Sequence, residues 1–478
     1  MSLQVVIVGG GITGLAAAYA LQRQAQERGL NMEYTVLEAA DRFGGKVTTD
    51  YQDGCVIEGG PDSFLTQKPA ALQLCRALGL EDELIPIQEH RPSSYILRGG
   101  RLHPLPEGMN LLAPTRLDAL WRTSLFTWPA KLRILWERFV PARLGEQDES
   151  LASFVGRRLG REALFFLAEP LFAGVHVAEA ERLSMAAAFP RFPALERQHG
   201  SLTRAARALG PAAGQTPAAN PTPAFLTLRD GLGRLIEALA SRLQGDDLRL
   251  NEPAEAIAPL DSERFTVRLR SGASLTADAV IVTTAAPSAA GLLQDWWPDL
   301  AHQLRQVRMN SSATVSLAYE AGAIQHPLNG TGFLVPRTES ARITGCTWTS
   351  AKFAHRAPDG MVLLRAFVGG PRAAEHVDLD DDALTDMVRR EFQRIMSITE
   401  APAFSRVYRW REAHPQYDVG HLELVEAIEH RCPRNLRLAG ASYRGLGLPD
   451  CIAQGEAAAS AILEELARLP VVVKGGRS

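Results

Sequence analysis

The chain has 478 residues and a mass of 52.0 kDa, too long for one hydrophobic core, so two or three domains are expected. Hydrophobic residues make up 46% and charged residues 22%, as in an ordinary globular protein. The formal net charge of -3 gives no general attraction to nucleic acid. The sequence has no apolar run near the roughly 20 residues of a membrane span.

The five cysteines are widely spaced, and no two of them form a C-x-x-C pair. This argues against a zinc ribbon and a disulfide framework, and favours free thiols in a reducing compartment. An apolar strand begins almost at once, with no basic leader before it. We therefore expect a cytoplasmic protein without a signal peptide. We expect no metal site, because no histidine or carboxylate cluster has ligand spacing.

The first 38 residues predict a βαβ unit. Residues 3–8 form a continuous apolar run, typical of a parallel strand buried on both faces. A helix over residues 16–28 and a strand over residues 34–37 follow. The turn between the first strand and the helix reads Gly9-Gly10-Gly11-Ile12-Thr13-Gly14, the dinucleotide pattern G-x-G-x-x-G. Its glycines permit a tight turn, close approach of a pyrophosphate, and helix packing against the strand.

The residues after this turn complete the dinucleotide pattern. The helix N-terminus offers free N–H groups to phosphates. Glu38, followed by Ala39, ends the second strand, where a carboxylate can accept hydrogen bonds from ribose hydroxyls.

A second signature, Arg42-Phe43-Gly44-Gly45-Lys46, matches an R-x-G-G-[RK] element of one group of FAD enzymes. Its glycines let the backbone pass close to a large ligand, and its cations suit phosphate oxygens. The sequence contains no second G-x-G-x-x-G, so we do not expect a nicotinamide domain. The substrate itself must then supply the electrons, and the pattern favours FAD held without a covalent bond.

The rest of the chain alternates helical and sheet patterns. Residues 111–193 are helical, with prolines at 114, 129, 141 and 170 breaking them into segments, and residues 210–223 are rich in Pro, Gly and Ala. Further predicted elements are a helix over 232–243, strands over 248–250 and 279–283, a hairpin of 265–270 with 274–277, a sheet within 305–370, a strand over 436–439 and a helix over 452–469.

Two stretches are more specific than the dinucleotide loops: Gly59-Gly60-Pro61-Asp62-Ser63-Phe64, and residues 440–452, which read GASYRGLGLPDCI. Shorter stretches agree with them, namely EPL at 169–171, TGF at 331–333, CTWT at 346–349 and PQY at 415–417. With these motifs the chain resembles the protoporphyrinogen/coproporphyrinogen oxidase family, most of all its soluble bacterial, coproporphyrin-forming type. The similarity covers nearly the whole chain.

The resemblance implies an α/β fold with a Rossmann-type FAD-binding domain of the monoamine-oxidase group, a mixed α+β substrate domain and a helical subdomain. The last strand and helix resemble the end of a nucleotide domain, so we expect that domain to be assembled from three segments. The expected ranges are 1–67, 224–288 and 404–478 for the FAD-binding domain, 68–110 and 289–403 for the substrate domain, 111–210 for the helical subdomain, and 211–223 for a linker.

By the same resemblance, Ala254 would meet the adenine through its backbone. Trp410 would lie near the isoalloxazine, although a core aromatic is the alternative. The full set of expected FAD contacts is Gly9, Gly10, Gly11, Ile12, Thr13, Gly14, Glu38, Ala39, Arg42, Gly44, Gly45, Lys46, Gly59, Gly60, Pro61, Asp62, Ala254, Trp410, Gly440, Ala441, Gly447, Leu448 and Pro449. A helix opening near Asp450 would also stabilise negative charge on a reduced flavin through its dipole.

The substrate residues implied by the resemblance are Lys68, Gly174, Val175, Phe333 and Phe367. Lys68 would meet a propionate, although a lysine at a helix start is often a solvated charge, and Phe367 fits the core of a strand equally well. The chain departs at residues 176–179, where relatives commonly read Tyr-Ala-Gly-Asp and this chain reads His-Val-Ala-Glu. We therefore carry over no exact pocket shape and name no catalytic base.

The implied reaction is the six-electron oxidation of coproporphyrinogen III to coproporphyrin III in haem synthesis, by three hydride transfers to FAD, with O2 reoxidising the cofactor to give peroxide. Alternatives are protoporphyrinogen IX oxidation, a flavin amine oxidase or desaturase, and a non-catalytic tetrapyrrole-binding flavoprotein. Hand-over of the product to a ferrochelatase fits this role. Residues 116–143 carry six basic residues and three tryptophans, which suits either peripheral membrane contact or ordinary solvated helices.

Overall fold

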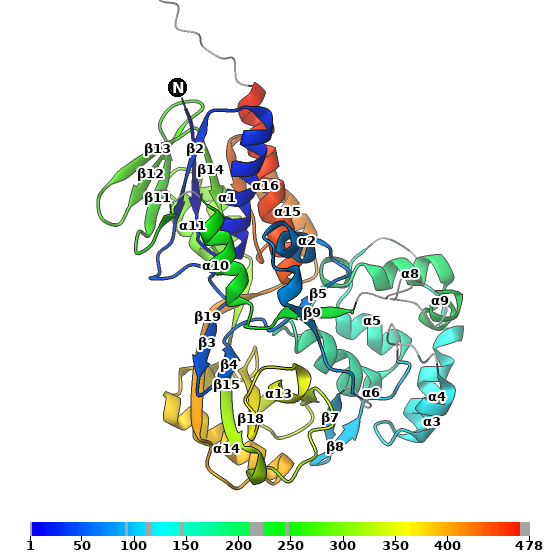
Figure 1. Ribbon diagram of the computed structural model, residues 1–478. Helices are drawn as coiled ribbons and strands as arrows, with labels where there is room; N and C mark the ends of the chain where they lie inside the picture. Colours follow the sequence, from blue (N-terminus) through cyan, green and yellow to red (C-terminus); the bar gives the residue numbers. More distant parts are fainter. Residues whose placement is uncertain are drawn as a thin grey trace, which may run out of the picture.

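The structure is a computed structural model that describes residues 2–90, 94–109, 112, 114, 116–143, 145, 147–209, 223–243 and 248–468. Three regions are visible in Figure 1: a parallel sheet with its helices at the top, a second large sheet below it, and a group of helices to the side. The predicted linker at 211–223 lies outside the described residues except for Pro223.

The upper region is a five-stranded parallel sheet in the order β10-β2-β1-β14-β20. Apolar side chains on alternate sides of β1 enter two different cores, so both faces of the sheet are covered. The strands are β1 Leu3–Val8, β2 Met32–Leu37, β10 Leu248–Arg249, β14 Ala279–Val282 and β20 Leu436–Leu438.

One face of this sheet packs against helices from both ends of the chain, and Figure 1 shows blue α1 beside red α16. The elements on this face are α1 Ile12–Arg28, α2 Ala70–Ala77, α10 Gly233–Arg242 and α16 Leu448–Arg468. The other face is covered by α11 Ala286–Leu293, α12 Pro298–Leu304, α15 His421–Arg431 and the antiparallel strands β11 Ala254–Pro259, β12 Phe265–Leu269 and β13 Ser274–Ala277.

The lower region is a seven-stranded sheet in the order β19-β15-β18-β17-β16-β7-β8. Its strands are β7 Tyr95–Arg98, β8 Arg101–Pro104, β15 Arg308–Glu320, β16 Gly332–Leu334, β17 Ile343–Trp348, β18 Met361–Gly369 and β19 Phe404–Gln416. Helices α13 Thr349–Lys352 and α14 Asp381–Met396 and the short helices η6 Ala321–Ala323 and η7 Ala374–Asp378 accompany it. Apolar side chains of the sheet and of α14 form one core.

The third region is a group of helices within the range 111–210 that was predicted as a helical subdomain. Its elements are α3 Leu117–Arg122, α4 Trp128–Trp136, η3 Glu137–Phe139, α5 Leu151–Arg158, α6 Arg161–Ala163, η4 Leu164–Ala173, α7 Met185–Ala188, α8 Arg191–His199 and α9 Leu202–Leu209. The fully buried Arg158 holds the group together by donating to Glu137 (2.6 Å) and Glu196 (2.5 Å).

Short strands connect the regions. They are β3 Thr49–Gln52 with β4 Cys55–Glu58, and β5 Phe64–Leu65, β6 Leu84–Pro86 and β9 Phe225–Leu228, with η1 Glu81–Glu83 before β6.

Three sequence-based expectations differ from the structure. Helix α1 starts at Ile12 rather than at residue 16, and α16 starts at Leu448 rather than at residue 452, because each glycine turn feeds directly into its helix. Pro170 does not break its segment but lies inside the π-helix η4, whose wider i→i+5 pattern includes the bond from Gly174 N–H to Glu169 O.

The expected domain ranges stay a proposal, with three boundaries revised. Helices α2, α11 and α12, which the ranges 68–110 and 289–403 assign wholly or largely to the substrate domain, pack in the cores of the upper sheet. The range 404–478 assigns β19 to the FAD-binding domain, yet β19 pairs along its length with β15 in the lower sheet. We therefore propose that the third FAD-binding segment starts after β19, near residue 417.

Candidate functional site

The first glycine loop joins β1 to α1 and leaves space in front of the helix. Gly9 has φ +111°, and a Cβ on Gly14 would lie 1.9 Å from Gly9 O, so the turn and the helix packing both require glycine. At Gly11 no heavy atom of the described residues lies within 4 Å of where a Cβ would be. No side chain caps α1. Open space and an uncapped helix N-terminus suit a pyrophosphate.

Glu38 holds this loop from the end of β2. Its two carboxylate oxygens accept hydrogen bonds from Gly10 N–H and Ala40 N–H, each at 2.8 Å. A carboxylate has about four lone-pair positions, so ribose hydroxyls could still bind. The segment before β11 runs alongside, since Glu252 N–H donates to Glu38 O (2.9 Å), and this brings Ala254 to the same edge of the sheet.

The second glycine loop lies against the first. Gly44 forms a bridge with Gly11, and a Cβ on Gly45 would lie 3.3 Å from Gly11 Cα. Arg42 donates to the carbonyls of its own loop, including Gly45 O at 2.7 Å. In this structure Arg42 therefore fixes the loop, while its expected phosphate contact stays a prediction.

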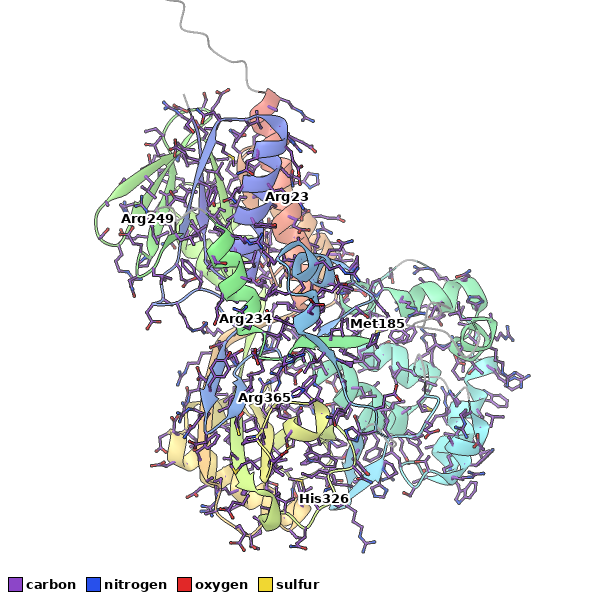
Figure 2. The ribbon with its side chains drawn as sticks, viewed as in Figure 1. Arg23, Met185, Arg234, Arg249, His326 and Arg365 are labelled. Carbon is purple, nitrogen blue, oxygen red and sulfur yellow. The ribbon has the colours of Figure 1, made fainter. Side chains whose placement is uncertain are left out.

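The segment 59–62 packs against the second loop and is held through its carbonyls. Gly59 O accepts hydrogen bonds from Trp410 Nε1 (2.9 Å), Thr314 Oγ1 (3.1 Å) and Arg365 Nη2 (3.0 Å). A Cβ on Gly60 would lie 1.7 Å from Lys46 O, so the two segments are packed backbone to backbone. Figure 2 shows Arg365 in the lower region, near the junction with the upper one.

Asp62 next to it is a largely buried anion, with its side chain 13% exposed, and is held by cations. Lys352 Nζ lies 2.9 Å from both of its carboxylate oxygens. Burial alone would raise the pKa of Asp62, but the charges of Lys352 and Arg365 outweigh burial and hold its pKa at about 2. Asp62 is therefore ionised at neutral pH and fixes the end of segment 59–62. Pro61 is half-buried beside it.

Lys46 and His414 form a buried pair of groups beyond the second loop. Lys46 Nζ donates to Ala413 O, and burial lowers the pKa of Lys46. Burial, followed by the nearby charge of Lys46, lowers the pKa of His414 to about 3. His414 is therefore neutral at pH 7, and its Nε2 lies 2.8 Å from Ser312 Oγ.

The C-terminal loop approaches the dinucleotide loops from the other side. Gly440 has φ +123° and lies beside Thr13. Tyr417 supports the loop by donating to Ala441 O (2.6 Å) and accepting from Gly445 N–H (2.9 Å). The expected FAD contacts Gly447, Leu448 and Pro449 stand at the start of α16.

Four of the five expected substrate residues fall into two groups, one after η4 and one in the lower sheet. Gly174 and Val175 follow η4, and Val175 is 71% exposed. Phe367 is half-buried, with the Arg365 guanidinium 5.1 Å from its ring centre. Phe333 is only 1% exposed and packs near Trp348 in the core of the lower sheet, so direct contact with a ligand would require the core to open. These substrate roles stay predictions.

Sequence reasoning missed two residues that hold the segment 174–179, whose residues 176–179 depart from the family pattern. Asn310 Nδ2 donates to Val177 O (2.8 Å), and Gln416 Oε1 accepts from Glu179 N–H (2.8 Å). Val177 has φ +52°, a conformation rarely adopted by a β-branched residue, which these bonds help to maintain. The only sequence signal was the stretch PQY, which contains Gln416 but does not indicate its partner.

Among the described residues no group of three or more His, Cys, Asp or Glu side chains could hold a metal ion. Within the same ranges no helix is long and apolar enough to cross a bilayer. All five cysteines are free thiols.

Comparison with known proteins agrees with this geometry. Residues 12–463 match the family described as flavin containing amine oxidoreductase. The chain is 38% identical to coproporphyrinogen III oxidase of Bacillus subtilis (strain 168), over 97% of this chain and 98% of that protein. It is 30% identical to chloroplastic protoporphyrinogen oxidase 1 of Spinacia oleracea, over 98% of this chain and 85% of that protein.

One crystal structure is similar to this chain over nearly its whole length. It is of a protein from Exiguobacterium sp. 255-15 provisionally named protoporphyrinogen oxidase, with a TM-score of 0.86 and 34% identity over 98% of this chain and 100% of that one. The cofactor is FAD, which the glycine loops and the open space at Gly11 fit. The fold is the expected α/β fold of the amine oxidase group, and the chain belongs to the flavin containing amine oxidoreductase family.

Proposed function

We propose that this protein is an FAD-dependent oxidase that converts coproporphyrinogen III to coproporphyrin III. The observation that carries the proposal is similarity over nearly the full length to coproporphyrinogen III oxidases, 38% in one case and 33% in another. The intact glycine loops support it, because a protein that had lost catalysis would be expected to lose them first. Bound FAD supplies the hydride acceptor for the substrate carbon.

The chain contributes position and electrostatics. Trp410, Thr314 and Arg365 fix segment 59–62, which would lie along the flavin. The N-terminus of α16 would face the flavin with its positive dipole end. Lys68 would bind a substrate propionate. We name no general base, because neither His176 nor His414 has been placed against a substrate atom.

Protoporphyrinogen IX is the main alternative substrate. It has two propionates where coproporphyrinogen III has four, and the spinach relative is named for it. The 38% identity to the coproporphyrinogen III oxidase of Bacillus subtilis, against 30% to the spinach relative, favours the substrate with four propionates. An amine oxidase is less well supported, because the stretches at 59–64 and 440–452 resemble the porphyrinogen enzymes.

We further propose O2 as electron acceptor, a cytoplasmic location, and hand-over of the product to a ferrochelatase. Peripheral membrane contact would use the surface of α3, α4 and η3. Trp128 is 65% exposed and Trp136 62%, with Leu132 and Phe139 exposed beside them. Apolar side chains mixed with arginines suit an anionic lipid surface. Sedimentation with vesicles containing anionic lipid would test this contact, and Trp136→Glu should reduce it.

The function is tested by adding the FAD-loaded protein to coproporphyrinogen III or protoporphyrinogen IX in air. Porphyrin fluorescence and peroxide are followed, and autoxidation is subtracted. Faster oxidation of coproporphyrinogen III supports the proposal, and faster oxidation of protoporphyrinogen IX assigns the alternative substrate. Failure to oxidise either would contradict both.

A further inference from the structure

Lys68, the residue expected to meet a propionate, already has an anionic partner. Its Nζ lies 2.7 Å and 2.8 Å from the two carboxylate oxygens of Asp450. The two residues are 382 positions apart in the chain, and Asp450 stands in the first turn of α16. The pair therefore forms only when the loop after β5 meets the C-terminal loop.

Asp450 is held in a fixed orientation. One of its oxygens accepts a hydrogen bond from Gly447 N–H at 3.1 Å. A Cβ on Gly445 would lie 2.6 Å from Asp450 Cγ, so only glycine leaves room for this carboxylate. The Asp450 side chain is 17% exposed and that of Lys68 is 53% exposed. The lysine is thus the partner that can turn away to solvent or to a ligand.

His176 lies within electrostatic range of both residues. Burial, followed by the charge of Lys68, lowers the pKa of His176 to about 4, while Asp450 acts in the opposite direction. The imidazole is therefore neutral at pH 7, so within this cluster of three residues Lys68 carries the positive charge. His176 Nδ1 is buried without a hydrogen-bond partner, and the ring packs edge-on against Phe189.

We propose that Asp450 is a specificity-determining residue: it holds Lys68 before substrate binds, and a substrate carboxylate must take its place. This rests on the proposed function, because it assumes a ligand that carries propionates. Lys68 then binds only a ligand whose carboxylate can compete with the preorganised carboxylate of Asp450. A ligand without a carboxylate at this position leaves the Lys68–Asp450 pair intact.

The test measures binding of coproporphyrin III by its fluorescence, with no turnover involved. Asp450→Asn keeps an oxygen for Gly447 N–H but removes the competing charge. We expect it to tighten binding about two- to fivefold, as for a partly exposed ion pair. Lys68→Met should weaken binding by about the same factor. The double variant should bind like Lys68→Met, because without Lys68 the carboxylate of Asp450 and that of the ligand no longer compete for a cation.

Two controls isolate the effect. Glu81→Gln removes a carboxylate from the exposed pair that Glu81 forms with Arg76 (2.8 Å), and should leave binding unchanged. Coproporphyrin III tetramethyl ester, which has no carboxylate, should bind wild type and Asp450→Asn equally. FAD content and melting temperature establish that each variant is folded.

The inference fails if Asp450→Asn binds coproporphyrin III no more tightly than wild type, or if Lys68→Met binds as well as wild type. Either result can occur in an enzyme that oxidises coproporphyrinogen III normally, and the proposed function would then stand. If the wild-type protein oxidises no porphyrinogen, the proposed function itself is contradicted, regardless of how tightly the variants bind coproporphyrin III.

Discussion

The dinucleotide loops and the segment 174–179, which is predicted to border the substrate, are held in place by different forces. The loops are fixed by glycines whose neighbours leave no room for a side chain, as at Gly14. Segment 174–179 has no such restriction after Gly174 and is held by the side chains of Asn310 and Gln416. Local steric requirements appear in the sequence as a motif, whereas long-range hydrogen bonds do not.

The largest effect should come from crowding the first loop. Gly14→Ala places a Cβ 1.9 Å from Gly9 O, and the contact is with backbone that cannot move aside. Overpacking costs about 1–3 kcal/mol, so we expect FAD affinity to fall by roughly one to two powers of ten. Flavin retained after gel filtration measures this. The control is Gly291→Ala in helix α11, where the added Cβ would have no neighbour beyond its own helix backbone within 4 Å among the described residues, and this variant should retain FAD. Loss of FAD in both variants would contradict the view that steric crowding fixes the first loop.

Removing the buried cation beneath segment 59–62 should have the next largest effect. Arg365→Met deletes the bonds to Gly59 O and Gly60 O and takes one cation away from Asp62. Each lost hydrogen bond costs about 0.5–1.5 kcal/mol, and Lys352 still pairs with Asp62, so we expect a total loss of about 1–2 kcal/mol. Urea unfolding should show a lower free energy of unfolding. An unchanged midpoint would show that Arg365 does not organise this segment.

The buried histidines should make the protein sensitive to acid. His414 has a folded pKa of about 3, below its usual value of 6.5, so the unfolded state binds more protons between these pH values. Stability is therefore fully present above pH 6.5 and falls with pH, by up to about 1.4 kcal/mol per pH unit for this residue. His414→Gln, which can still bond Ser312, should flatten the pH dependence of urea unfolding. If the free energy of unfolding of the variant falls just as steeply with pH, His414 is not the cause of the acid sensitivity.

The smallest effect should come from Trp410→Phe. This change keeps a ring but removes the hydrogen bond from Nε1 to Gly59 O, one of three to that oxygen. A single hydrogen bond contributes about 1 kcal/mol, so we expect a severalfold weaker FAD affinity by titration of the apoprotein. A loss as large as that of Gly14→Ala would mean that the ring itself contacts the cofactor.

The difference between local steric requirements and long-range hydrogen bonds explains which parts of the fold could be predicted from the sequence. The continuous apolar runs of β1 and β14 revealed the parallel sheet, and the glycine patterns located the cofactor loops. Strand β19 was not predicted, because its arginines and half-buried positions give no apolar alternation. Its pairing with β15 supplies the order that its own residues lack.

The candidate site shows the same limit. Asn310 and Gln416 are 106 residues apart and meet only through the register of two strands. Lys68 and Asp450 are separated by most of the chain. Pairs of this kind need the tertiary structure before their partners can be named, whereas Gly9 or Gly14 can be interpreted within a window of six residues.

In a porphyrinogen oxidase of this kind, the porphyrinogen delivers its electrons to the bound flavin. The most direct measurement is to mix the FAD-loaded protein with coproporphyrinogen III without oxygen and to monitor the visible absorbance of the flavin. We predict that the absorbance bleaches in a single turnover, faster than with protoporphyrinogen IX, and returns when air is admitted. A flavin that stays oxidised with both porphyrinogens would contradict the account.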